Sequence, residues 1–207
     1  MPRSLSIAFA LVVGCSGPEP ARDEAAVTPV SSPSAAAGEV APFPVPAGFP
    51  DAPEHHLAPD RAPTPYTAAE IRGACGKGRT TKWRMVTPKG EFISVHRFIS
   101  ADAKGARWQS LLVRADGVQQ DSKELTGTWD ELQSHASYPA ADTRITAGRT
   151  DVPAGEYDCW IYEVEEKGSV TTYWFAKDLP GPPIRIEILQ GPRRVLDMQL
   201  VEVLRAR

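Results

Sequence analysis

The chain has few of the residues from which metal sites and catalytic centres are built. It contains only three cysteines and four histidines in 207 residues. No cysteine or histidine pair has the spacing of a zinc site, and no serine lies in a nucleophile-elbow motif. From Tyr66 onward, 20 basic residues stand against 19 acidic ones, so a basic footprint for nucleic acid is lacking. The composition therefore predicts no metal, no cofactor, no nucleic-acid partner and no enzymatic activity.

The remaining candidates for chemistry are weak. His55 and His56 lie near several acids but in a proline-rich segment, which gives no framework for a metal site. The glycine-rich stretch 73–80 is only superficially similar to a phosphate-binding loop. Ile71, two residues before it, stands where the first glycine of that motif belongs. His96 shares a strand face with two phenylalanines, which indicates a packed, hydrogen-bonded histidine rather than a base.

The sequence has no apolar run near the roughly 20 residues that a membrane-spanning helix needs. Its one short run, Leu5 to Val13, follows Arg3 and ends in Val12-Val13-Gly14-Cys15. This pattern resembles a bacterial lipobox, which implies that residues 1–14 are a signal peptide. The resemblance further implies a diacylglycerol on the Cys15 thiol, with a fatty acid such as palmitate completing the anchor. The alternatives are an ordinary secretory signal and a buried N-terminal helix.

The resemblance to lipoproteins also implies a cellular location. A lipid on Cys15 would be the only membrane element of the chain, and its acyl chains would anchor it stably. Ser16 stands where an aspartate marks retention at the inner membrane of enteric bacteria. We therefore expect a lipid-anchored protein of the cell envelope, in the outer membrane of a Gram-negative bacterium.

Residues 15–65 are predicted to be a disordered tether that follows the lipidated cysteine. Residues 16–65 hold 12 of the 20 prolines and no tryptophan. Such a segment buries too little apolar surface to offset the entropy of ordering, so it should be extended and stiffened by its prolines.

Residues 66–207 are predicted to form one globular domain, because all five tryptophans lie there. Capping boxes at Thr67/Glu70 and Thr128/Glu131 predict short helices over residues 68–74 and 129–136. Alternating apolar and polar residues between turn signals predict nine strands. The strands span residues 80–87, 91–99, 107–115, 118–125, 143–150, 156–165, 169–177, 184–190 and 195–204.

The strand pattern predicts the fold class. Three isoleucines at 184, 186 and 188 alternate with Arg185 and Glu187, which is typical of an antiparallel sheet with one buried face. A twisted sheet of about nine strands tends to curl. The sequence therefore predicts a mainly β, α+β fold: a curled antiparallel meander resembling a half-barrel, with two short helices, of which 129–136 covers the concave side.

A family resemblance appears in the C-terminal half. It is carried by the turn and strand Val152 to Cys159, the strand Tyr173 to Ala176, the loop Pro180 to Pro183 and the closing strand. These features, over roughly residues 148–202, resemble uncharacterised exported bacterial β-rich domains. Those domains are similar to the half-barrels of lipoprotein-localisation carriers, which enclose acyl chains beneath a helical lid. The matching motifs are structural, so the resemblance assigns no ligand-binding residues.

Lipidation of Cys15 would leave one pair of cysteines, Cys75 and Cys159, in a compartment that permits disulfides. A bridge between them is predicted, and its loop of about 84 residues would contribute on the order of 4 kcal/mol in the chain-entropy model. The alternative is two buried thiols that behave as small apolar residues.

Two functions fit these predictions. In the first, the concave face binds an acyl chain or another apolar ligand, lined by aromatic residues: Trp83, Trp108, Trp160, Trp174 and Phe175. In the second, the core is filled, and loops such as Asp178 to Pro183 contact another envelope protein. The sequence predicts the first function, with the second as the alternative; against the first, aromatic residues that alternate on strands are commonly plain core.

Overall fold

The computed structural model of the protein describes residues 43–205. The predicted signal peptide, Cys15 and most of the tether lie outside the described residues. In chain order, the elements are η1 (Pro53–His55), α1 (Ala68–Ala74), β1 (Thr80–Thr87), β2 (Gly90–Ala101), β3 (Gly105–Arg114), β4 (Gln119–Thr128), α2 (Trp129–Ser134), η2 (Ala140–Asp142), β5 (Thr143–Val152), β6 (Gly155–Glu166), β7 (Ser169–Ala176), β8 (Arg185–Gln190) and β9 (Arg193–Leu204). Each predicted strand and helix corresponds to one of these elements.

Both helices begin as their capping boxes predict. The Thr67 side chain accepts a hydrogen bond from the Glu70 amide, and the Glu70 carboxylate accepts one from the Thr67 amide. Thr128 and Glu131 repeat the arrangement at α2. These reciprocal bonds satisfy amides that would otherwise be orphaned at a helix start. Helix α2 ends at Ser134, two residues before the predicted end.

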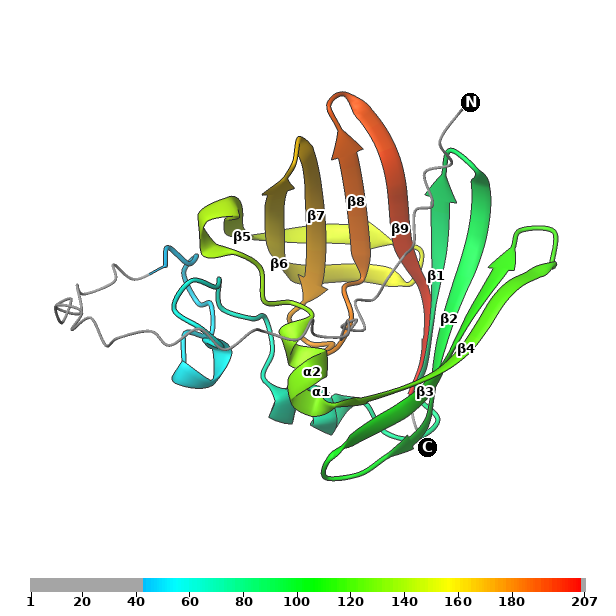
Figure 1. The fold of residues 1–207 in the computed structure, drawn as a ribbon, viewed down its shortest axis with the longest axis horizontal. Coiled ribbons are helices and arrows are strands. Elements are labelled where there is room, and N and C mark those ends of the chain that lie inside the picture. The colour runs from blue at the N-terminus through cyan, green and yellow to red at the C-terminus, as the bar shows by residue number, and fades with distance from the viewer. Residues whose placement is uncertain (1–42, 206–207) are drawn as a thin grey trace, which may run out of the picture. The chain divides into compact units, whose positions relative to one another are not determined.

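The nine strands form one sheet in the order β4-β3-β2-β1-β9-β8-β7-β6-β5. Every neighbouring pair is antiparallel. Two meanders, β1–β4 and β5–β9, meet where the first strand pairs with the last (Figure 1). From the edge strand β4, the chain crosses to the opposite edge strand β5 through α2 and η2. This crossing places α2 over one face of the sheet.

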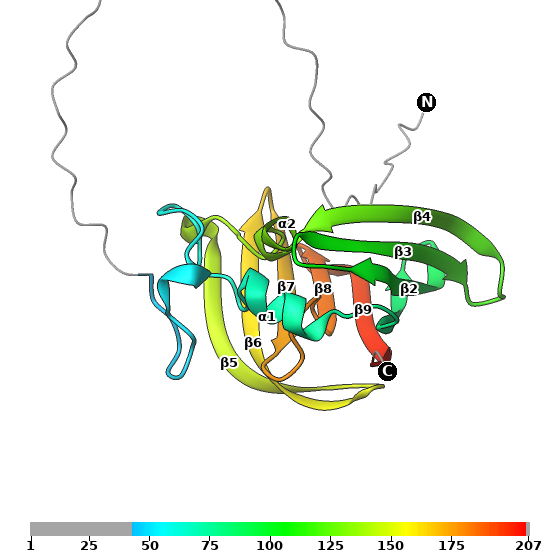
Figure 2. The same cartoon turned by 90° about the horizontal axis from the view of Figure 1, so that it is seen from below.

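The sheet is curled and unclosed, as predicted. Register shifts interrupt four strand pairs, for example between Lys82 and Trp83 on β1. Such bulges bend a strand and increase its twist. Seen from below, the strands follow an arc, with α1 and α2 in its hollow (Figure 2). We call the face that carries Trp83, Phe98, Trp108 and Phe175 the inner face, and the opposite face the outer face.

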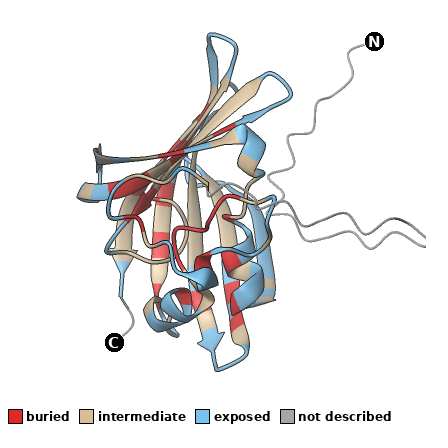
Figure 3. Ribbon diagram, turned by 90° about the vertical axis from the view of Figure 1, so that its left-hand side faces the viewer, coloured by how far each residue is buried: buried red, intermediate tan, exposed pale blue. Residues whose placement is uncertain are grey.

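The ordered part of the domain begins before the predicted boundary at residue 66. Residues 62–66 are all buried, and Phe49 is only 7% exposed. Figure 3 shows buried stretches in the segment that runs across the strands. We call residues 43–66 the strap. Its few apolar side chains are enough because hydrogen bonds to the domain supplement them, a contribution that composition alone does not reveal.

The core forms two clusters of buried side chains. One joins the helices and the strap to the inner face of β2, β3 and β5–β7. Its members include Phe49, Tyr66, Ile71, Trp129 and Tyr162. The other lies around β1, β8 and β9 and includes Trp83, Met85, Ile184, Leu196 and Leu200. The wide apolar inner face is thus buried by elements of the same chain.

Candidate functional site

The five aromatic residues predicted to line a cavity divide between the two faces of the sheet. Trp83, Trp108, Trp160 and Phe175 are at most 6% exposed and belong to the core. Trp174 lies on the outer face, because it pairs with Arg185, and the Arg185 guanidinium stacks 4.7 Å from its ring centre. The structure therefore brings four of the five into the core and places Trp174 elsewhere.

The strap and the N-terminal end of the domain cover the inner-face aromatics. The ring of Phe49 packs edge-on against Trp160 at 5.0 Å between ring centres. The ring of Tyr66 packs on Phe175 at 6.0 Å, and its hydroxyl donates to the Ala176 carbonyl. The Tyr162 hydroxyl donates to the Pro63 carbonyl over 2.8 Å. These contacts occupy the face on which the first hypothesis placed an acyl chain.

Gln133 on α2 holds the strap in place. Its side-chain Nε2 donates to the Glu54 carbonyl at 2.8 Å and to Thr64 Oγ1 at 2.9 Å. Its Oε1 accepts from the Ala68 amide at 2.8 Å. The residue is only 4% exposed; its bond to Thr64 is buried, and the other two are partly buried. One amide side chain of α2 thus contacts the strap at two points, in η1 and at Thr64, and also the start of α1.

Cys75 and Cys159 are both buried free thiols in the structure, so the predicted bridge is not formed in it. Burial raises the pKa of both thiols, that of Cys159 to about 12. The buried Arg79 guanidinium donates to Cys75 Sγ at 2.9 Å, which only partly opposes this effect. The thiols therefore remain protonated at neutral pH and serve as packing groups.

The predicted contact loop, Asp178 to Pro183, is tied to the domain. Arg79 donates to the Pro180 carbonyl at 2.8 Å, and Trp83 Nε1 donates to the Pro183 carbonyl at 3.1 Å. Asp178 itself is exposed. The loop is thus held to the domain by these two hydrogen bonds, and the Asp178 side chain is exposed to solvent.

His96 is packed, as the sequence indicates, but it has no hydrogen-bond partner among the described residues. Its ring lies edge-on to Trp83 with 5.0 Å between ring centres. Burial alone lowers the pKa of His96 to about 4. The imidazole is therefore neutral at physiological pH, and no carboxylate is placed to make it a general base.

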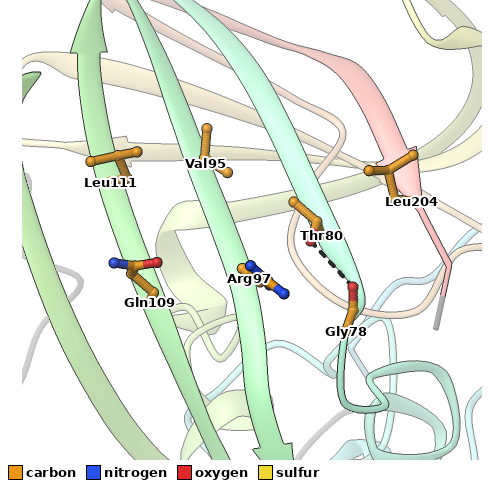
Figure 4. A pocket seen from close by; sticks show the side chains of 7 residues that line it. All are labelled: Gly78, Thr80, Val95, Arg97, Gln109, Leu111 and Leu204. Carbon is orange, nitrogen blue, oxygen red and sulfur yellow. Dashed lines mark hydrogen bonds between the residues drawn. The ribbon is translucent and has the colours of Figure 1, made fainter. Parts of the chain in front are cut away.

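A hollow of about 460 Å³ opens on the outer face, and we call it the outer groove (Figure 4). Arg97 and Gln109 lie side by side at its centre, as cross-strand partners on β2 and β3. Val95 and Leu111 form the next row on the same strands. The remaining wall consists of Gly78, Thr80 and Leu204.

Among the basic side chains on the outer face of β1–β3, only Arg97 has no carboxylate partner; outside these strands, Lys77 and Arg205 lie next to the groove-lining Gly78 and Leu204. The other three basic side chains on the outer face of β1–β3 each pair with a carboxylate: Lys82 with Glu202, Arg84 with Glu91 and Arg107 with Glu124. The Arg97 guanidinium makes no ion pair or hydrogen bond within residues 43–205, whereas its backbone pairs in the sheet. The outer groove therefore presents one available guanidinium between apolar walls.

The outer groove is not among the predicted sites, although the sequence carries a signal for it. Strand β2 carries apolar residues on both faces: Phe92 and Phe98 inward, Ile93 and Val95 outward. In a strand with one solvent-exposed face, apolar and polar residues should alternate more strictly. This departure from alternation marks an outer face that is apolar beyond the needs of the core.

A second hollow, of about 410 Å³, lies between α1 and the β2–β3 loop. Its basic residues, Arg72 and Lys77, stand beside Asp102, whose carboxylate accepts backbone hydrogen bonds from Lys104 and Gly105. No group of three or more histidine, cysteine or acidic side chains in residues 43–205 could hold a metal ion. Nor does any described helix have the length and hydrophobicity to cross a bilayer.

The chain matches no known family model and no curated protein sequence. Its structure is similar to that of a candidate lipoprotein from Parabacteroides distasonis, with 10% identity and a TM-score of 0.47 over 63% of this chain and 96% of that one. It is also similar to a chain of the Pseudomonas aeruginosa MucA/MucB complex, with 11% identity and a TM-score of 0.43. That second match spans 66% of this chain and 56% of the other.

Proposed function

We propose that the protein is a lipid-anchored lipoprotein of the bacterial cell envelope that acts by contacting another envelope protein. The proposal of an anchor is supported by the lipobox-like sequence that ends at Cys15. Ser16, which follows the cysteine, supports the outer membrane as the location of the protein. A role without catalysis is supported by His96, a packed histidine that has no acid or nucleophile paired with it among the described residues.

The occupied inner face is the observation that carries this function. An acyl chain on that face would have to displace Phe49 and Tyr66, which pack on Trp160 and Phe175. It would also have to break the hydrogen bonds through which Gln133 holds the strap. The filled core therefore favours an interaction protein over a lipid carrier.

Native mass spectrometry of protein purified from its own membranes tests this function. We expect one mass that corresponds to the mature chain with its covalent acyl groups. A second, dissociable lipid at one copy per chain would overturn the proposal, because it would reveal an occupied binding site. The same measurement on a Cys15→Ser variant separates anchored from bound lipid.

Labelling with radioactive palmitate tests the anchor independently of the core. Wild-type protein should incorporate label and stay with membranes after a high-salt wash. The Cys15→Ser variant should incorporate none and be released. Equal release of both proteins would contradict lipidation while leaving the filled core untouched.

A further inference from the structure

We propose that the outer groove binds a protein segment that carries a carboxylate beside a bulky apolar side chain. The proposal rests on the proposed function, because it names the surface and the chemistry through which the domain contacts its partner. The carboxylate would pair with Arg97, and the apolar side chain would pack against Val95, Leu111 and Leu204.

The unpaired charge of Arg97 determines the polar half of the partner. Lys82, Arg84 and Arg107 are already paired, so one guanidinium remains available within the described part of this face. Guanidinium groups bind carboxylates through two parallel hydrogen bonds. The neighbouring Gln109 amide is exposed and could add a third hydrogen bond.

The groove walls determine the apolar half. Leu204 is 48% exposed at the end of β9, and Val95 and Leu111 are half-buried. Ile93 and Val113 extend the same apolar surface by one row of cross-strand partners. A volume of about 460 Å³ is sufficient for one or two large side chains but is at the small end for a complete ligand site.

The small number of cations at the outer groove also selects the class of partner. Recognition of anionic membranes commonly uses clusters of four to eight basic residues. The lining of the outer groove offers one, and the adjacent Lys77 and Arg205 bring the number to three, fewer than such a cluster. A protein segment with one acid and an adjacent apolar residue fits this arrangement, whereas a phospholipid surface does not.

Titration with a synthetic peptide, followed by amide chemical shifts, tests the proposal. The protein is the chain from Ser16 onward, which keeps every described residue. The probe is a capped heptapeptide, Gly-Ser-Leu-Glu-Leu-Ser-Gly, added to about 2 mM so that weak binding is detected. We expect saturable shifts at Val95, Arg97, Gln109 and Leu111. The same peptide with glutamine in place of glutamate should bind about tenfold more weakly.

Two variants of matched charge supply the control. Arg97→Glu should weaken binding by about tenfold or more, because attraction becomes repulsion, a change of at least 1.4 kcal/mol. Arg144→Glu makes the same change at an exposed site on β5 that pairs with Glu163, and it should leave binding unchanged. Both side chains are exposed, so both variants should fold with unaltered far-UV circular dichroism.

Three results would overturn the proposal. The first is an absence of shifts in the outer groove at 2 mM peptide, a concentration about twice a 1 mM Kd. The second is equal binding by Arg97→Glu and wild type. The third is a concentration-dependent dimer in sedimentation that Arg97→Glu abolishes, since the occupant would then be a second copy. None of these results bears on lipid in the core, which native mass spectrometry measures separately.

Discussion

Replacing Gln133 with alanine should detach the strap from the domain. The substitution removes one buried and two partly buried hydrogen bonds, and it takes the side-chain partner from the Glu54 carbonyl and the Ala68 amide. A buried polar group without a partner costs about 1–3 kcal/mol. The two groups left here are only partly buried, so the low end of this range applies to each, and we expect a loss of roughly 2 kcal/mol in the free energy of unfolding. Since small domains have only about 5–15 kcal/mol in total, the effect should be large.

Urea denaturation of the chain from Ser16 onward measures this loss, with tryptophan fluorescence as the signal. Gln120→Ala is the matched control, because Gln120 is exposed on β4 and makes one exposed hydrogen bond. The control should change stability by less than about 0.5 kcal/mol. Limited trypsin digestion provides a local readout, since detachment should speed cleavage after Arg61.

The reasoning would be refuted by two results together: a Gln133→Ala stability within about 0.5 kcal/mol of the control, and unchanged cleavage after Arg61. That outcome would mean that water replaces the amide without cost and that the strap is held mainly by its apolar contacts.

Three further predictions concern the core. Phe49→Ala should lower the free energy of unfolding by about 3 kcal/mol through loss of its packing on Trp160, as urea midpoints would show. His96 should make the protein acid-sensitive: its pKa is about 4 when folded against 6.5 for the free residue. The unfolded state therefore binds the extra proton, and stability falls as pH drops below 6.5. Wild type should lose about 2.5 kcal/mol more than His96→Gln between pH 7.5 and 4.5. Finally, a thiol reagent should modify neither Cys75 nor Cys159 in the native protein and both after unfolding in urea without reductant; no reaction in urea would instead demonstrate a bridge.

Local sequence signals predicted the elements of the fold well. The capping boxes at Thr67 and Thr128 placed both helix starts because those interactions lie within one turn. One of the turn signals between the predicted strands is the pair Asp116-Gly117, which is typical of a tight hairpin, and it lies in the β3–β4 turn, where Gly117 adopts a φ of 87°. Such features depend on residues close in sequence, so one sequence is enough to find them.

Long-range contacts account for what the sequence could not predict. The strap was placed in the tether because its composition is rich in proline and poor in apolar residues. Its order depends on Gln133, which is 79 residues away from Glu54. Trp174 was grouped with four core aromatics, although strand parity turns it to the outer face beside Arg185. The outer groove combines residues from β1, β2, β3 and β9, and only the pairing of first and last strands brings them together.

The occupied inner face is tested most directly by titrating a fluorescent fatty acid into two proteins. These are the wild-type chain from Ser16 onward and its Phe49→Ala variant, which removes the ring that covers Trp160. The account predicts no saturable binding to wild type and at most weak binding to the variant, because Tyr66 and the hydrogen bonds of Gln133 still cover the inner face. Saturable binding of one fatty acid per wild-type chain would contradict the account and identify the domain as a lipid-binding protein.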